Sequence, residues 1–292
     1  MSGRACIFVE VLFVHFPDGR RVLGGAPFNV AWHLQAFGES PFLVSRVGDD
    51  AEGASVRDAM QAWRMDSDGL QVDESLPTGR VQVTISDGEP AYEIVHPAAW
   101  DAIEPPAVIP AMSLLYHGSL ALRDAASRRA WQSLRIGQPA IVFVDVNLRP
   151  PWWNREQVLR DIRGAHWAKL NRDELDQLAP GAASSRKRAE SLLQRMGLQG
   201  LLLTDGARGA QAEPEPGVAD ERTQVAIGEA GHRRCRPVTE DTQQQRVVGH
   251  TRRDARVVAG VVDPAGDDAR RKQEDASDGG VEERAACPGV QV

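Results

Sequence analysis

The segment GGAPFNVAWHLQAFG, residues 24–38, predicts a glycine-rich turn that leads directly into a helix. Pro27 suits the first helical turn, apolar residues recur at helical spacing from residue 30 to residue 37, and Gly38 ends the pattern. Glycine lets the backbone approach a ligand closely, and Asn29 offers one acceptor and two donors. The segment is therefore either a site that recognises hydroxyl groups or an ordinary turn into a helix.

Apolar runs rich in β-forming residues alternate with helical patterns throughout residues 1–210. Such alternation is typical of an α/β protein, in which helices cover a sheet. We expect strands at residues 7–14, 42–45, 113–116, 140–144, 165–170 and 200–204, and helices at residues 27–37, 54–63 and 186–196.

One segment departs from this alternation. Residues 79–95 have period-two patterns on both sides of Asp87-Gly88, which predicts a β-hairpin. A hairpin inserted into a βα chain suggests a small accessory sheet, and in enzymes such a sheet commonly acts as a lid.

The composition changes abruptly after residue 210. Every leucine, methionine and aromatic residue lies before Gln211, and Ile227 is the only isoleucine of residues 211–292. This tail has 28 charged residues among 82 and too few large apolar side chains to offset the entropy cost of ordering its backbone. We expect a folded but incomplete domain over residues 1–210 and a disordered tail over residues 211–292. Our hypothesis for the change is a frameshift near Ala210.

The charge balance argues against two classes of partner. The chain has 34 Lys+Arg and 41 Asp+Glu, a formal net charge of −7, so it lacks the basic field that nucleic acids or anionic membranes require. No stretch approaches the roughly 20 apolar residues that cross a bilayer. Three irregularly spaced cysteines make no disulfide framework, which favours a reducing, cytoplasmic location.

A polar segment follows the expected strand at residues 140–144. In DVNLRPPWW, residues 145–153, alternate positions hold Asp145, Asn147 and Arg149. Ligands of open α/β sheets bind beyond the carboxyl ends of the strands. We expect these three side chains to share one face there. The alternative is a plain turn that ends at two prolines, with a solvated Arg149.

Two further segments have both a chemical and a structural interpretation. In KLNRDE, residues 169–174, Asn171 and Glu174 either place a carboxylate beside phosphates and hydrated Mg²⁺, or form an N-cap and its capping-box partner. In TDGARG, residues 204–209, Gly206 and Gly209 either cradle a nucleotide phosphate or form a simple turn.

Taken in chain order, these segments resemble the ribokinase-like (PfkB-type) carbohydrate kinase family, nearest to its fructokinase-like members, over about residues 5–210. The strongest match is residues 24–38, followed after nine residues by Gly48 in SRVGDD, and Pro77-Thr78-Gly79 matches the start of the hairpin. The resemblance implies an α/β fold, a three-layer α/β/α sandwich with a small β-lid.

The resemblance also implies ATP-dependent transfer of a phosphoryl group to a sugar hydroxyl, with Mg²⁺ as cofactor and a possible homodimer formed through the lid. It implies contacts with the sugar for Gly24, Gly25, Asn29, Asp145, Asn147 and Arg149. It implies contacts with ATP for Lys169, Asn171, Glu174, Thr204, Gly206 and Gly209, with Glu174 holding the metal through water.

The chain departs from the family pattern in two places that matter for activity. Val9 and Val14 stand where the family has a glycine and a sugar-binding aspartate. The family's Gly-Ala-Gly-Asp segment, which supplies an anion hole and the catalytic base, has no counterpart in residues 211–292, where Asp254 is only a weak candidate base. We therefore expect either an impaired sugar kinase or a non-catalytic sugar- or nucleotide-binding remnant.

Overall fold

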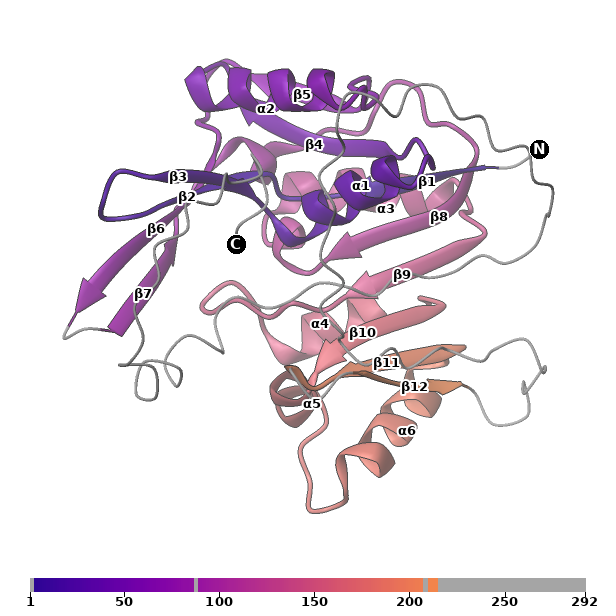
Figure 1. The fold of residues 1–292 in the computed structure, drawn as a ribbon. Helices are drawn as coiled ribbons and strands as arrows, with labels where there is room; N and C mark the ends of the chain where they lie inside the picture. Colours follow the sequence, from indigo (N-terminus) through magenta and orange to yellow (C-terminus); the bar gives the residue numbers. More distant parts are fainter. Residues whose placement is uncertain (1–2, 87–88, 207–209, 215–292) are drawn as a thin grey trace, which may run out of the picture. The chain divides into compact units, whose positions relative to one another are not determined.

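The main sheet of the computed structural model, which describes residues 3–86, 89–206 and 210–214, has eight strands (Figure 1). Their order is β12-β11-β10-β9-β8-β1-β4-β5. The strands are β1 (Arg4–Phe8), β4 (Phe42–Gly48), β5 (Leu70–Asp73), β8 (Met112–Gly118), β9 (Ile141–Asp145), β10 (Trp167–Asn171), β11 (Gly200–Thr204) and β12 (Ala210–Pro214). Neighbouring strands are parallel, except that β12 is antiparallel to β11. The parallel strands therefore end at one common edge, and the expected α/β class is confirmed.

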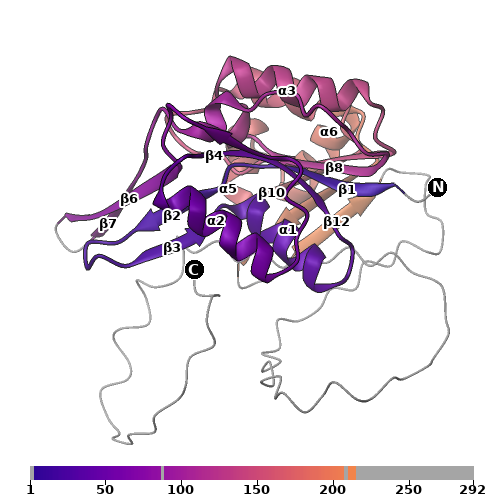
Figure 2. The ribbon, with the colours of Figure 1, turned by 90° about the horizontal axis from the view of Figure 1, so that it is seen from above.

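Helices cover both faces of this sheet. They are α1 (Ala26–Ala36), α2 (Ala51–Ala62), α3 (Ala125–Ile136), α4 (Arg155–Ile162), α5 (Arg172–Leu178) and α6 (Ser185–Met196), with 3₁₀ turns η1 (Ala99–Ala102) and η2 (Leu120–Leu122). Figure 2 shows α1 and α2 on one face and α3 and α6 on the other. On the α1 face, Phe28, Val56 and Met60 pack with Ile7 and Leu43 of the strands.

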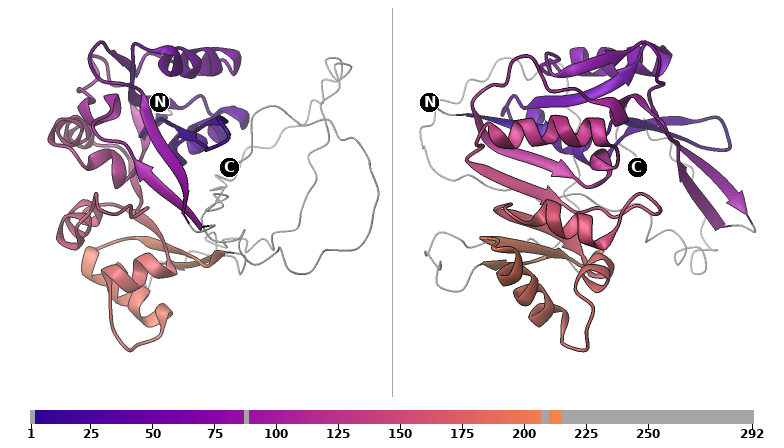
Figure 3. Two further views of the ribbon diagram at one scale, coloured as in Figure 1. Left: turned by 90° about the vertical axis from the view of Figure 1, so that its left-hand side faces the viewer. Right: turned by 180° about the vertical axis from the view of Figure 1, so that it is seen from behind.

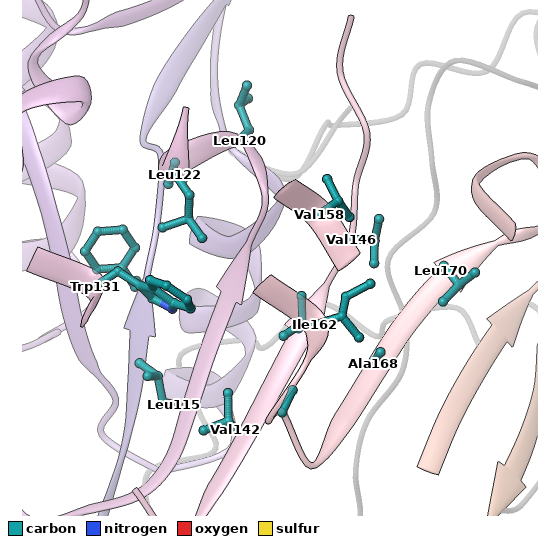
Figure 4. Packing of buried hydrophobic residues seen from close by; sticks show 14 of the residues in the cluster. Leu115, Leu120, Leu122, Trp131, Val142, Val146, Val158, Ile162, Ala168 and Leu170 are labelled. Atoms are coloured by element: carbon teal, nitrogen blue, oxygen red, sulfur yellow. The ribbon is translucent and has the colours of Figure 1, made fainter. Parts of the chain in front are cut away.

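The larger core lies on the opposite face, beneath α3, α4, α5 and α6. Trp131 of α3 and Ile162 of α4 pack there with Leu115, Val142 and Leu170 of three strands (Figure 4). Figure 3 shows from behind how helices lie across the strands on this face. Each large apolar side chain buried in this way contributes about 1.5–3 kcal/mol.

A second sheet has four strands in the order β3-β2-β6-β7. It joins β2 (Leu12–His15), β3 (Arg21–Gly24), β6 (Gly79–Ser86) and β7 (Glu89–Ile94). Strands β6 and β7 form the antiparallel hairpin that the sequence pattern predicts, and β2 pairs with β6 in parallel. Figures 1 and 3 show this sheet extending to one side of the main sheet. We call it the lid sheet.

The prediction of one strand over residues 7–14 is wrong. The chain forms β1 in the main sheet, leaves it at residues 9–11, and continues as β2 in the lid sheet. The backbone N–H of Val9 still donates to the Val44 carbonyl, and the Ser45 hydroxyl donates to the Val9 carbonyl at 2.7 Å. An apolar run does not show where a strand changes sheets, because both halves are buried.

Several elements were not predicted, namely β3, β5, α3, α4 and the turns η1 and η2, whereas the start of α5 follows one of the two interpretations of Asn171 and Glu174. At the other end, β12 extends to Pro214, so the boundary predicted at residue 210 falls inside a strand that pairs with β11. The rest of the predicted tail, including Asp254, lies outside the described residues, as do Gly209 and the turn at Asp87-Gly88.

Two further features of the described residues concern membrane-spanning helices and the Cys6 thiol. In the part of the chain that the structure describes, no helix is both long enough and apolar enough to cross a membrane. Cys6 is a free thiol inside the core, where burial raises its pKa to about 12. This thiol therefore stays protonated and packs as a small apolar group.

Candidate functional site

A buried ionic network lies at the carboxyl ends of the central strands. Asp145 and Lys169 are register partners on β9 and β10, so their side chains lie next to each other on one face of the sheet. The Lys169 ammonium lies 2.9 Å from both oxygens of the Asp145 carboxylate. The Tyr116 hydroxyl, from β8, donates to the same carboxylate at 2.8 Å. The Asp145 carboxylate is thus held by the Lys169 ammonium and the Tyr116 hydroxyl.

The environment of Tyr116 fixes its protonation state. Burial, the charge of Asp145 and the hydrogen bond to it all raise the pKa of Tyr116 well above its ordinary value. The phenol is therefore a permanent donor at neutral pH. It also stacks on Phe143, with ring centroids 5.5 Å apart.

Asn171 and Glu174 form the capping box that was one of the two interpretations of their spacing. The Asn171 side chain accepts from the Glu174 N–H at 2.9 Å, and Glu174 Oε2 accepts from the Asn171 N–H at 2.8 Å. Glu174 Oε1 accepts from the N–H of Leu148 at 2.8 Å. Glu174 therefore ties the start of α5 to the loop that follows β9.

Glu174 is buried, and this burial raises the pKa of its carboxyl, while the N–H groups of Asn171 and Leu148 act in the opposite direction. Both of its oxygens already accept hydrogen bonds from the backbone. Direct coordination of a metal would compete with these bonds, whereas a contact through water would preserve them.

The loop after β9 does not have the geometry expected from the sequence. The strand ends at Asp145, and Asn147 has a φ of 45°, in the left-handed region. The regular alternation of a strand therefore stops at Asn147. The Ser119 hydroxyl holds the loop by donating to the carbonyls of Val146 and Asn147.

Arg149 lies in this loop and has one described hydrogen bond, from Nη1 to the carbonyl of its neighbour Leu148 at 3.3 Å. The side chain is only partly buried. It therefore keeps most of its donors for other partners.

The glycine-rich turn at residues 24–25 begins α1 beside the link between the two sheets. Gly25 has a φ of 112°, and a Cβ there would lie 2.4 Å from the Glu10 carbonyl oxygen. The position therefore requires glycine. α1 has no side-chain cap, and the Asn29 N–H donates to the Gly25 carbonyl.

Glu10 is a residue of this site that sequence reasoning missed, because a single acidic residue inside an apolar run carries no signal for a site. Glu10 is 1% exposed, and its Oε2 has no hydrogen-bond partner in the part of the chain that the structure describes. Burial raises the pKa of Glu10 to about 7, and the charge of Arg149 opposes the shift.

A second missed group joins the lid sheet to α2. Asp50 caps α2 by accepting from the Gly53 N–H at 2.7 Å, and it also accepts from the hydroxyl and the N–H of Thr78 at 2.7 and 2.8 Å. The Thr78 hydroxyl in turn accepts from the Gly48 N–H at 2.9 Å. These contacts hold residues 77–79, at the start of the hairpin, against residues 48–53, at the start of α2.

The residues expected at the nucleotide lie at the end of β11. Thr204 is its last residue and is register partner to Asn171. Gly206 is exposed, has a φ of 52° and faces open space where a Cβ would be. Lys169 lies one strand away, but its ammonium is paired with Asp145.

A cavity of about 270 Å³ lies beside the chain that follows β9, lined in part by Ser119, Arg123, Trp152 and Asp161. None of the residues expected to bind sugar or nucleotide lines this cavity. It is therefore separate from the candidate site.

A parallel α/β sheet covered on both faces, with a small sheet at one side and polar groups at the strand ends, defines the ribokinase-like fold class. Solved structures share this fold. Fructokinase from Vibrio cholerae O395 in apo form has a TM-score of 0.66 at 24% identity, covering 74% of this chain and 79% of that chain. Aminoimidazole riboside kinase from Salmonella enterica, complexed with aminoimidazole riboside and an ATP analog, has a TM-score of 0.62 at 23% identity, covering 72% and 73%.

The chain belongs to the pfkB family of carbohydrate kinases, whose model matches residues 8–217. It is 29% identical to Fructokinase-2 of Oryza sativa subsp. japonica over 202 residues, covering 64% of this chain and 60% of that protein. It is 28% identical to Fructokinase-2 of Zea mays, with the same coverage. The chain thus spans about 60% of the length of these relatives.

Proposed function

We propose that this chain acts in ATP-dependent phosphoryl transfer to a hydroxyl of a sugar, with fructose as the first substrate to test. The observation that supports this function is the convergence of Lys169, Asn171, Glu174 and Thr204 at one edge of the sheet, in a chain of the pfkB family. Ligands of open α/β sheets bind at that edge.

The sugar side of the site is proposed to be the turn at Gly24 and Gly25, the first turns of α1 with Asn29, and the loop with Asn147 and Arg149. The close contact between Gly25 and the Glu10 carbonyl fixes this turn at the start of α1. Among the described residues Arg149 has a single hydrogen bond, so most of its donors are available to a ligand. Asp145 supports this loop indirectly, since its carboxylate is held by Lys169 and Tyr116.

The nucleotide side is proposed to be Thr204 and Gly206 at the end of β11, where the backbone is open. Gly209 belongs to the same proposal but lies outside the described residues. Glu174 fits Mg²⁺ only through water, because both of its oxygens accept backbone hydrogen bonds. A hydrated Mg²⁺ there would neutralise charge on the phosphates.

Phosphoryl transfer also needs a base for the attacking hydroxyl. In the described part of this edge we assign no such base, and the family's Gly-Ala-Gly-Asp segment is absent from the sequence. We propose that the transfer step is slowed by about 10²–10⁴-fold for this reason. The weak candidate base, Asp254, lies outside the described residues.

The alternative is a sugar- or nucleotide-binding remnant without turnover, which the missing motif favours. Titrations of ATP and of fructose by calorimetry, with turnover measured in parallel on the full chain, separate the two functions. Binding with slow turnover supports the kinase, and binding without turnover supports the remnant. If neither ligand binds, both proposals fail.

A lid-mediated homodimer in the cytoplasm completes the proposal. Ile85 and Tyr92 of the hairpin are 64% and 53% exposed and offer apolar surface to a second copy of the lid sheet. Sedimentation of the full chain and of a Tyr92→Ser variant tests this pairing. A monomeric wild type would contradict it.

A further inference from the structure

Three basic side chains share one face of the lid sheet, each on a different strand. His15 of β2 is the register partner of Arg21 of β3. Arg80 of β6 is the register partner of Phe13, which lies two residues before His15 on β2. Register partners, and residues two apart on a strand, lie on the same face of a sheet. Like charges on neighbouring strands repel each other, so this face of the lid sheet needs an acid.

Glu52, in the first turn of α2, is the acid that meets these three groups. Its Oε1 lies 2.6 Å from Nε2 of His15 and 3.6 Å from Nη1 of Arg21, and its Oε2 lies 3.6 Å from Nη2 of Arg80. Glu52 is only 8% exposed, and the start of a helix favours its negative charge. Figure 2 shows α2 alongside β2 and β3. One buried carboxylate on the main domain thus joins three strands of the lid sheet.

The same face of the lid sheet also has apolar contacts, but these lie nearer to its base. Phe13 and Leu23 are register partners on β2 and β3 and pack with the core on the α1 face. His15 and Arg21 lie two residues further from the base. In the part of the chain that the structure describes, every ion pair between a lid strand and the main domain has Glu52 as its acid. Glu52 is therefore placed to control the angle of the lid sheet.

We propose that Glu52 is a positioning residue, which holds the lid sheet against α2 and thereby fixes the turn at Gly24 and Gly25. Strand β3 carries Arg21 and ends at Gly24, so it connects the ion pairs to that turn. Without the carboxylate, Arg21 and Arg80 are left uncompensated on one face, and the lid strands open locally while the main sheet stays folded. The effect on a bound sugar rests on the proposed function, whereas the hold on the lid sheet does not.

Hydrogen–deuterium exchange of the full chain at pH 7, read by mass spectrometry, tests the hold on the lid sheet. The variant is Glu52→Gln and the matched control is Glu156→Gln, since Glu156 is also in the first turn of a helix and lies 3.7 Å from an arginine, Arg160, but is 86% exposed. Glu52→Gln should accelerate exchange in residues 12–24 and 79–94 by about 10-fold or more, and the control should not. Unchanged exchange in the lid strands, or an equal acceleration in β1 and β4, would overturn the inference.

Two further variants separate the ion pairs from other effects of the substitution. In a background with Arg21→Met and Arg80→Met, Glu52→Gln should cause a much smaller acceleration, because only the contact with His15 is left to lose. Glu52→Asp keeps the charge and should retain part of the protection. If Glu52→Gln accelerates exchange equally in both backgrounds, the cluster does not hold the lid sheet.

Titration of fructose by calorimetry keeps the inference distinct from the proposed function. The dissociation constant should rise by at least about 2-fold in Glu52→Gln, the change expected when half of the molecules lose the held arrangement, and should not rise in Glu156→Gln. If fructose binds wild type and Glu52→Gln equally, the positioning role is refuted. If wild type binds no fructose, the proposed function fails, and the exchange measurement alone decides whether Glu52 holds the lid sheet.

Discussion

The buried pair of Asp145 and Lys169 allows a stability prediction that depends on tertiary structure alone. Their side chains are 6% and 18% exposed, and two N–O distances of 2.9 Å join them. With an effective dielectric constant of about 20, charges at 3–4 Å attract each other by about 4–6 kcal/mol. Lys169→Met keeps an unbranched, flexible side chain, one atom shorter, and removes the charge together with its hydrogen-bond donors.

This substitution leaves the Asp145 carboxylate buried, with the Tyr116 hydroxyl as its remaining side-chain donor. Removing one partner of a buried ion pair typically costs about 3–5 kcal/mol, because the other charge stays uncompensated. We therefore expect Lys169→Met to lower the free energy of unfolding by about 3–5 kcal/mol. Adding Asp145→Asn should restore most of the loss, to within about 1–2 kcal/mol of wild type.

Urea denaturation at pH 7, followed by far-UV circular dichroism, measures these differences. The matched control is Arg160→Met, which removes a charge from an exposed pair with Glu156, where the N–O distance is 3.7 Å. Such exposed pairs contribute about 0.3–0.5 kcal/mol. If Lys169→Met costs no more than this control, or if Asp145→Asn adds a further loss instead of restoring stability, the assignment of a buried network is refuted.

Three other predictions concern residues of the same edge. Burial raises the pKa of Glu10 from 4.5 to about 7, so the stability associated with its neutral form is fully present below pH 4.5 and is lost as the pH rises through 7. The shift of about 2.5 pKa units corresponds to up to about 3 kcal/mol, at about 1.36 kcal/mol per unit. Between pH 4 and pH 8 the free energy of unfolding of Glu10→Gln should therefore increase by up to about 3 kcal/mol relative to that of wild type. Urea unfolding across that range checks this, with the exposed Glu39→Gln as control, and parallel profiles would contradict it. Gly25→Ala should lose about 1–3 kcal/mol or more, because a Cβ would clash with the Glu10 carbonyl in addition to the strain of a φ of 112°. Gly19→Ala has a similar strain, at a φ of 84°, but its Cβ meets only open space, so it should lose less in the same assay. Asn171→Ala removes the cap of α5 and should lower the thermal midpoint, at a cost of about 1 kcal/mol, while Asn171→Asp retains the acceptor; equal midpoints for wild type and alanine would exclude the capping role.

The polar residues at the strand ends fall into two sets, one that stabilises the site and one that is available to a ligand. Asp145, Lys169, Tyr116 and Glu174 hold the loop and the strand ends in place, since each has its partners inside the protein. Among the described residues, Arg149 keeps donors and Gly206 keeps open backbone for a ligand. Substitutions in the first set should therefore affect stability before they affect binding.

Much of the fold was predictable because its signals are local. Buried parallel strands are short apolar runs, and the helix after Gly25 has a proline start, a helical spacing and a glycine end. The hairpin at residues 79–95 was predictable for the same reason, since period-two patterns flank a turn-forming pair. The capping box at Asn171 and Glu174 was one of the two interpretations that their spacing allowed.

Other features had no local signal, and tertiary contacts decided them. The apolar run at residues 7–14 is divided between two sheets, because its first half pairs with β4 and β8 and its second half with β3 and β6. The left-handed conformation of Asn147 ends the strand alternation after Asp145, and the sequence pattern did not indicate it. Glu10 belongs to the site only because β8 and α1 pack around it and bury its carboxyl there. Hydrophobic periodicity reports which residues are buried, whereas the partner of a buried charge is set by strands that are distant in sequence.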